Sequence, residues 1–280
     1  MAHPTSPSAA GQRPIGQKVA GPALAAAGLY LAGYFLPLVS AGGQSVKLSD
    51  GEGGVWMWVV PAVLAIVAAV VGFTGQAVAG AVAAGVVTAL AGMTTFQLLF
   101  IHRQYDAPGV SKGIGFWALA LAVTTAFGTI VPLLTARVAA DPKCEQVTSM
   151  LGAVAFAGVP LAVLLPADGF SPLSDIDDGL LKFGLVVWAL VAPLAAAALA
   201  LSRRPAGLAF AGGVALGHLG YTVMVLQSDA GAAVLGVGHT ALYHWTTVTA
   251  LVLTTTAFAG SLKAASGGAA EGRTLQKAAT

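Results

Sequence analysis

The chain has 280 residues, of which 57% are hydrophobic and only 9% are charged, and its formal net charge is +2. A soluble domain is about 25% charged, so this composition excludes an ordinary soluble globule. The small net charge gives no basis for a nucleic-acid partner, and a single cysteine, Cys144, excludes an internal disulfide framework.

Eight apolar stretches follow one another along the chain, each without Lys, Arg, Asp or Glu in its centre. Crossing the hydrocarbon of a bilayer takes about 20 such residues in a helix. We therefore predict an all-α, polytopic membrane helix bundle. The eight predicted transmembrane helices occupy residues 19–39, 55–73, 77–101, 113–135, 147–165, 180–201, 206–227 and 239–262.

Polar segments flank these helices. Residues 1–18 and 263–280 are rich in small and polar residues, which predicts disordered tails. Polar loops are expected at 40–54, 102–112 and 166–179, and residues 139–146 form a linker with Cys144 in it. No motif places a His or an acidic partner beside this thiol, so we interpret it as a bystander.

Charge distribution predicts the orientation. The segments on the side of the N-terminus hold nine of the 13 Lys and Arg residues, and the opposite side holds eight of the 11 acidic residues. Basic residues favour the cytoplasm, so we expect both termini to be cytoplasmic in a plasma membrane. Trp56, Trp117 and Trp245 lie near the outer ends, as interfacial aromatic residues do. Signal-peptidase cleavage at Val39-Ser40-Ala41 is the alternative, and it would leave seven spans.

Short motifs recur at offsets of 123 to 131 positions. Leu48-Ser49-Asp50 returns as Leu173-Ser174-Asp175, and Leu36-Pro37 returns as Leu165-Pro166. Together with the matching loop order, they predict two four-helix repeats, at 19–138 and 147–262. An even number of spans makes the repeats parallel, related by an axis along the membrane normal, as in some transporters. A fusion of structural modules without a transport pathway is the alternative.

Two segments carry a resemblance. The first is Gly33-Tyr34-Phe35-Leu36-Pro37-Leu38-Val39-Ser40, and the second is Gly113-Ile114-Gly115-Phe116-Trp117-Ala118-Leu119. They resemble the end of the first span and the start of the fourth in small four-span membrane proteins of high-GC Gram-positive bacteria. Leu38 stands where Trp is usual, and in the second half His239 replaces the Phe. The resemblance implies a bacterial plasma-membrane protein of no assigned activity, and it brings no site residues.

Two intramembrane histidines, His218 and His244, are the candidate cofactor ligands, because polar groups inside a membrane are functional hypotheses. Their depths differ by roughly five residues, about 7 Å, which does not suit two axial ligands of one haem. Hydrogen bonding between helices is the alternative. In the loop at 166–179, Asp175, Asp177 and Asp178 are candidate calcium ligands, although they lack the full spacing of a calcium loop, and a solvated acidic loop is the alternative.

Small residues at a spacing of four form a ridge in each of two predicted helices. Such ridges allow helices to approach closely, so we expect them to pack within the bundle, with a partner-protein face as the alternative. The ridge residues are Ala209, Gly213, Gly217 and Gly220 in one helix and Ala81, Gly85 and Ala89 in the other.

No catalytic constellation or nucleotide-binding fingerprint occurs in the sequence, and no cofactor is expected. The first functional hypothesis is a non-enzymatic accessory or scaffolding subunit, with membrane lipids and other integral membrane subunits as partners. A carrier or channel for a neutral or lipid-like solute between the two halves is the second. A His-ligated metal or haem protein is the third.

Overall fold

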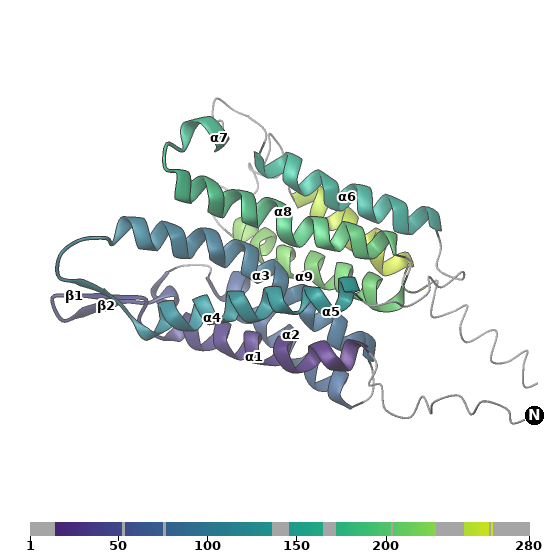
Figure 1. Cartoon of the computed structure of the whole chain (residues 1–280), viewed down its shortest axis with the longest axis horizontal. Helices are drawn as coiled ribbons and strands as arrows, with labels where there is room; N and C mark the ends of the chain where they lie inside the picture. The colour runs from purple at the N-terminus through teal and green to yellow at the C-terminus, as the bar shows by residue number, and fades with distance from the viewer. Residues whose placement is uncertain are drawn as a thin grey trace, which may run out of the picture.

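The computed structural model describes residues 15–51, 54–74, 77–135, 146–164, 172–202, 204–227, 244–257 and 259. Long helices lie side by side along the longest axis of the molecule (Figure 1). Residues 244–257 form a further helical segment. The helices are α1 (Ile15–Phe35), α2 (Val60–Phe73), α3 (Ala77–Gln104), α4 (Ile114–Gly128), α5 (Ile130–Thr135), α6 (Gln146–Leu164), α7 (Pro172–Asp175), α8 (Gly179–Leu201) and α9 (Pro205–Gln227).

Five described helices are long and apolar enough to cross a membrane: Val55–Phe73, Val78–Gln104, Ile114–Thr135, Gly179–Leu201 and Pro205–Val223. They coincide with five of the eight predicted spans. The other three predicted spans are also helical, at α1, α6 and 244–257, but none of them is among these five. Helix α6 contains an apolar stretch at Gln146–Leu161, and α1 is rich in Ala and Gly, which are only weakly apolar. Helix α1 begins at Ile15, inside the segment 1–18 predicted as a disordered tail.

A small three-stranded sheet forms within two of the predicted loops and accompanies the helices. Strands β1 (Val39–Ala41), β2 (Gln44–Val46) and β3 (Val110–Lys112) pair antiparallel in the order β2-β1-β3. Gly42 and Gly43 join the first two strands at φ values of 57° and 83°. A two-residue hairpin turn favours positive φ at both positions, and glycine reaches it without steric cost. The Gly-Gly pair was therefore a hairpin signal within the predicted loop.

The two segments that carry the sequence resemblance meet in space. The Gly113 amide donates to the Leu38 carbonyl at 2.8 Å, and the Gly115 amide donates to the Pro37 carbonyl at 2.8 Å. A Cβ on Gly115 would lie 2.9 Å from the Leu36 carbonyl carbon. These residues therefore hold the end of α1 tightly against the start of α4, beside the β1–β3 pairing.

Helix α2 turns small residues inward and large ones outward, the reverse of a helix in a soluble protein. Because lipid is as apolar as a protein core, burying large side chains brings no hydrophobic gain in a membrane, and small residues let backbones approach. The buried positions are Pro61, Ala62, Ala65, Ala69 and Gly72. The exposed positions include Val63, Leu64, Val67, Val70 and Phe73.

Helix α3 occupies the centre of the bundle and packs against α1, α2, α4, α8 and α9. Its most extensive contact is with α9, where the two predicted ridges meet. A Cβ on Gly85 would lie 2.8 Å from the Val214 nitrogen, and one on Gly217 would lie 2.6 Å from the Ala89 Cβ. Gly85 lies opposite Gly213, and Ala89 lies opposite Gly217, so α3 and α9 run parallel.

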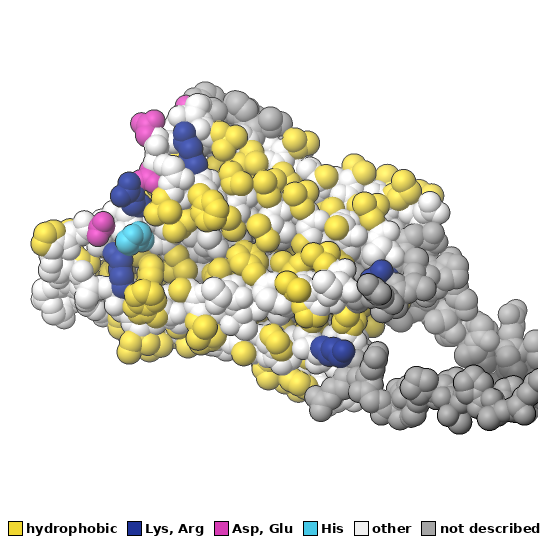
Figure 2. Space-filling model, viewed as in Figure 1, with side chains coloured by type: hydrophobic (Ala, Val, Ile, Leu, Met, Phe, Trp, Pro, Cys, Tyr) yellow, Lys and Arg dark blue, Asp and Glu magenta, His cyan; other side chains and the backbone are white. Residues whose placement is uncertain are grey.

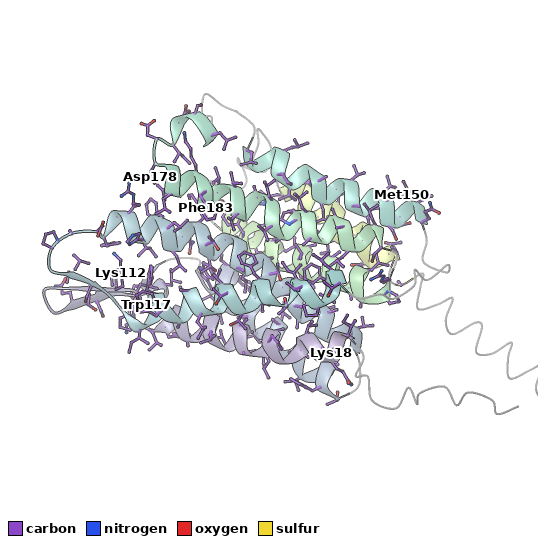
Figure 3. All side chains as sticks on the ribbon, in the orientation of Figure 1. Lys18, Lys112, Trp117, Met150, Asp178 and Phe183 are labelled. Carbon is purple, nitrogen blue, oxygen red and sulfur yellow. The ribbon has the colours of Figure 1, made fainter. Side chains whose placement is uncertain are left out.

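Charged side chains gather at the two ends of the molecule and leave an apolar belt between them (Figure 2). Lys112 and Asp178 lie at the end that carries the sheet, and Lys18 lies at the other (Figure 3). Large apolar side chains such as Val154 on α6 and Val131 on α5 are exposed on this belt. The belt and the five long apolar helices are the properties of a multi-pass membrane protein.

The glycines at 212 and 213 allow a test of the α3–α9 contact on a single helix. We expect Gly213→Ala to destabilise the fold by about 1–3 kcal/mol, because the new Cβ collides with the backbone of Val82. Gly212→Ala is the matched control, since its Cβ would meet only the Thr254 hydroxyl, at 4.0 Å. Reversible unfolding in detergent micelles measures both changes. Equal effects of the two substitutions would contradict this packing.

Candidate functional site: a cavity between the helices

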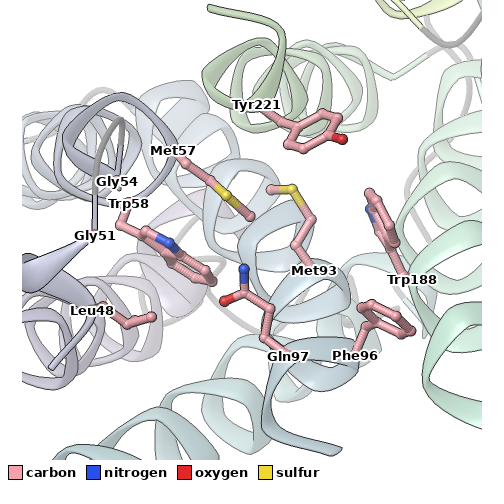
Figure 4. A pocket seen from close by; sticks show the side chains of 10 residues that line it. All are labelled: Leu48, Gly51, Gly54, Met57, Trp58, Met93, Phe96, Gln97, Trp188 and Tyr221. Atoms are coloured by element: carbon pink, nitrogen blue, oxygen red, sulfur yellow. The ribbon is translucent and has the colours of Figure 1, made fainter. Parts of the chain in front are cut away.

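A cavity of about 340 Å³ lies in the half of the bundle that carries the sheet. Helices α3, α8 and α9 wall it, together with two short segments between β2 and α2: the 3₁₀ turn η1 (Leu48–Asp50) and the π-helical turn η2 (Val55–Val59). Figure 4 shows the side chains turned toward this space. The lining residues are Leu48, Gly51, Gly54, Met57, Trp58, Met93, Phe96, Gln97, Trp188 and Tyr221.

The π-helical turn sets one wall. Pro61 follows this turn and has no N–H to give to the Met57 carbonyl, which its ring would crowd in a regular α-helix. The wider turn, closed by the Val60 amide on the Val55 carbonyl, accommodates it. Met57 and Trp58 are both buried on this turn and face the cavity. Single π turns inside helices are frequent at functional sites.

Three aromatic rings form the opposite wall. The Trp188 ring lies 6.0 Å from the Phe96 ring at 34°, and 5.9 Å from the Tyr221 ring at 82°, measured between centroids. Glycines bring the helices close enough for these contacts: a Cβ on Gly184 would lie 3.1 Å from the Phe96 Cα, and one on Gly92 would lie 3.3 Å from the Trp188 Cα. Such tilted and edge-to-face pairs stabilise one another, so this wall is preorganised.

Gln97 supplies the distinctive polar group of the cavity. Its side-chain oxygen is buried and has no hydrogen-bond partner among the described residues. In Figure 4 its amide lies between the Trp58 and Met93 side chains. A buried carbonyl oxygen without a donor is costly, so the site is suited to a molecule that brings an N–H or O–H group.

None of the ten lining residues carries a charge. Bringing an ion into such a site without a counter-charge is strongly unfavourable. Aromatic rings and methionine thioethers instead favour flat or flexible apolar molecules. The arrangement therefore suits non-covalent binding of a neutral, largely apolar molecule.

Both candidate cofactor histidines are buried, but neither lines the cavity. The Nδ1 atom of His244 lies 2.8 Å from the Thr222 hydroxyl, and its ring stacks on Tyr221 with centroids 5.8 Å apart. His218 lies fully buried on α9. Within the described residues, no three His, Cys, Asp or Glu side chains gather as a metal site would require. His244 instead supports the cavity from behind Tyr221.

The three candidate calcium ligands do not form one site. Asp178 caps α8: one carboxylate oxygen accepts from the Leu180 and Leu181 amides at 2.8 and 3.1 Å, and the other accepts from Arg103 Nε at the end of α3. The hydrogen bond from Arg103, aided by the amides, lowers the pKa of the Asp178 carboxyl. Asp175 and Asp177 are exposed, and the three carboxylates, all of them described, do not gather into a group that could hold a metal ion.

Sequence reasoning missed the cavity, although part of its signal was visible. Gln97 is an uncharged polar residue inside an apolar span, and a search restricted to charges and histidines passes over it. In the sequence, Trp188 differs from Trp56, Trp117 and Trp245 only in lying farther from the outer end of its predicted span. Its contacts with Phe96 and Tyr221 join three helices, and no local pattern encodes such contacts.

The sequence matches no protein-family model, no curated protein and no solved structure. The fold and the site together define a class: a helical multi-pass membrane protein with an uncharged cavity between its helices. The function is therefore argued from the chemistry of this cavity.

The Asp178 carboxylate provides a pH-dependent test of the link between α3 and α8. Its folded pKa lies below the ordinary value of 3.8. Its contribution to stability is therefore complete above pH 3.8 and is lost as the pH falls through the folded value. We expect thermal unfolding of the wild type to show this loss and Asp178→Asn, which keeps a capping oxygen, to lack it. Asp178→Ala should lower the melting temperature more than Asp178→Asn at pH 7, and the reverse order would contradict this role.

Proposed function

We propose that the protein is a non-enzymatic membrane carrier that binds a neutral, largely apolar solute in the cavity between its helices. The observation that carries this proposal is the cavity itself: about 340 Å³, uncharged, walled by aromatic and thioether side chains, with the buried Gln97 oxygen. Small-molecule sites are typically concave, mostly apolar and about 300–1,000 Å³, with few polar groups that fix orientation.

The position of the cavity supports a carrier rather than a purely structural role. It lies where the two halves of the sequence meet: η1, η2 and α3 come from the first half, and α8 and α9 come from the second. Solute sites in many transporters lie at the interface between internal repeats. A solute in the cavity contacts residues from both halves of the chain, so its binding depends on how the two halves pack against each other.

We also propose that the bundle has eight spans in two parallel repeats. The α3–α9 contact supports a duplication, because it is reciprocal: a Cβ on Gly85 would meet the Phe210 carbonyl, and one on Gly213 would meet the Val82 carbonyl. Val82 and Phe210 are 128 positions apart, as are Gly85 and Gly213. The same offset for both pairs is what a two-fold axis between related helices produces.

The accessory-subunit hypothesis has less support. A partner-protein face was the alternative interpretation of the small-residue ridges, and all seven ridge residues are buried in the bundle. A stoichiometric partner protein that remains bound through purification from native membranes in mild detergent would favour the accessory role. A partner-free species that carries an extractable neutral compound would favour the carrier.

Binding of the neutral probe N-phenyl-1-naphthylamine tests the cavity, because the probe combines two aromatic ring systems with one N–H donor. We expect saturable energy transfer from tryptophan to the probe in nanodiscs. Gln97→Leu should weaken binding about three- to tenfold, the contribution of one hydrogen bond, and Trp188→Ala should weaken it further. Trp117→Ala is the control, because this tryptophan lies outside the cavity. Unchanged affinity in both cavity variants would contradict the proposal.

We propose that the membrane is the plasma membrane, and that both termini lie in the cytoplasm. Among the described residues, all acidic side chains lie in segments at the end with the sheet, namely Asp50, Asp106, Asp175, Asp177 and Asp178. Lys18 and Arg204 lie in segments at the opposite end. In the full sequence, the segments predicted on that side hold nine of the 13 Lys and Arg residues, and this excess supports a cytoplasmic location.

Thiol labelling of intact cells tests this orientation. In a Cys144→Ser background, we expect a membrane-impermeant maleimide to label Asp106→Cys, in the loop before β3, from outside. Ser202→Cys, in the turn between α8 and α9, should be labelled only after the cells are opened. The opposite pattern would reverse the orientation and leave the cavity proposal intact.

A further inference from the structure

A second cavity, of about 500 Å³, lies between α3 and α4, away from the solute cavity. Leu98 and Leu99 of α3 and Phe116, Trp117 and Val123 of α4 supply apolar walls. The Thr95 hydroxyl in this wall is already satisfied, since it donates to the Ala91 carbonyl of its own helix at 2.8 Å. The wall therefore offers apolar contact, and Trp117, 63% exposed, stands at its edge.

One end of this groove is positively charged. Lys112, the last residue of β3, places its ammonium there beside His102. The ammonium donates to the Tyr105 carbonyl at 3.0 Å and reaches the His102 carbonyl at 3.5 Å, and strand pairing of Lys112 with Val39 fixes its backbone. The group is held in place by neutral acceptors that leave its positive charge uncompensated.

The acidic residue next to the Lys112 contact in the sequence is Asp106, which follows Tyr105, and it forms no salt bridge with Lys112. A salt bridge at this end joins Arg103 to Asp178. That pairing takes up the Asp178 carboxylate, and among the described residues no carboxylate forms a salt bridge with Lys112. Figure 3 places Lys112 and Trp117 at the same end of the bundle, with Asp178 on the far side of α3.

The dimensions of the groove fit one leaflet of a bilayer. From Ile114 at the start of α4 to Val123 is nine residues, about 14 Å along the helix. Half of the hydrocarbon thickness of a bilayer is about 15 Å. An acyl chain lying against Phe116 and Val123 would therefore place its headgroup at the level of Lys112, where an exposed tryptophan such as Trp117 is also favoured.

We propose that this groove is a binding site for an anionic phospholipid, with the phosphate on Lys112 and one acyl chain between α3 and α4. Charge complementarity selects this occupant: a fixed ammonium with no salt-bridge partner among the described residues ends an otherwise apolar groove. His102, at the same end, offers a second nitrogen to the headgroup. The lipid site shares no lining residue with the solute cavity, so it stands independently of the carrier function.

Brominated phospholipids test the proposal, because bromine quenches tryptophan fluorescence at contact. The full chain is reconstituted in phosphatidylcholine vesicles, with either phosphatidylcholine or phosphatidylglycerol brominated on its acyl chains. The Trp117 signal is taken as the difference between the wild type and Trp117→Phe. We expect phosphatidylglycerol to be favoured about fivefold, as about 1 kcal/mol from one interfacial lysine implies, and high salt should reduce this preference.

Variants distinguish lipid binding in this groove from a general effect of positive charge at this end of the protein. Lys112→Gln should abolish the preference, whereas Lys112→Arg should retain it. Lys47→Gln should also retain it, since it removes the same charge at the same end but outside the groove. Equal quenching by the two lipids in the wild type, or a preference unchanged in Lys112→Gln, would overturn the proposal. Absence of quenching by either lipid would also overturn it, because it would mean that protein covers the groove. If Lys112→Gln does not fold, the lipid preference and salt dependence of the wild type decide the question.

Discussion

The close contact between α3 and α9 is the constraint on which the rest of the structure depends. In lipid, helices gain nothing from hiding apolar side chains, so they associate where backbones can approach. Gly85 and Gly213 provide this approach at the centre of the bundle. Farther along α9, Gly220 meets the η2 turn, where a Cβ would lie 2.7 Å from the Trp56 carbonyl. The cavity lies beside this contact between Gly220 and η2. The helices around the cavity are held together by the Gly85 and Gly213 contacts at the centre of the bundle.

Several contacts restrain the helix ends at the end of the molecule that carries the sheet. At the end with the sheet, short strands, the Arg103–Asp178 pair and the glycine contact between α1 and α4 hold the helix ends in register. These contacts lie at the same end of the bundle as the cavity and restrain the helices that form its walls. Preorganisation of this kind lowers the cost of binding, because fewer side chains have to be ordered when a ligand arrives.

The sequence predicted the parts of this fold that depend on local composition. Five apolar stretches coincide with helices long enough to cross a membrane, and the ridge glycines of both central helices are buried. The sheet was missed because its strands are only three residues long, although Gly42-Gly43 signalled the hairpin. The cavity could not be predicted, because Trp58, Gln97, Trp188 and Tyr221 come from four separate elements. Their proximity follows from how the helices pack, and a single sequence carries no information on that.

The contact between α3 and α9 is reciprocal, and its surfaces resemble those that join separate subunits. Val82 and Gly85 present to α9 the same pattern of backbone and glycine that Phe210 and Gly213 present to α3. A surface that is complementary to its own counterpart is what joins two identical subunits in a two-fold dimer. The chain thus contains, within one polypeptide, a junction of the kind that otherwise forms between separate copies, and its linker ensures that the two surfaces are always made in equal number.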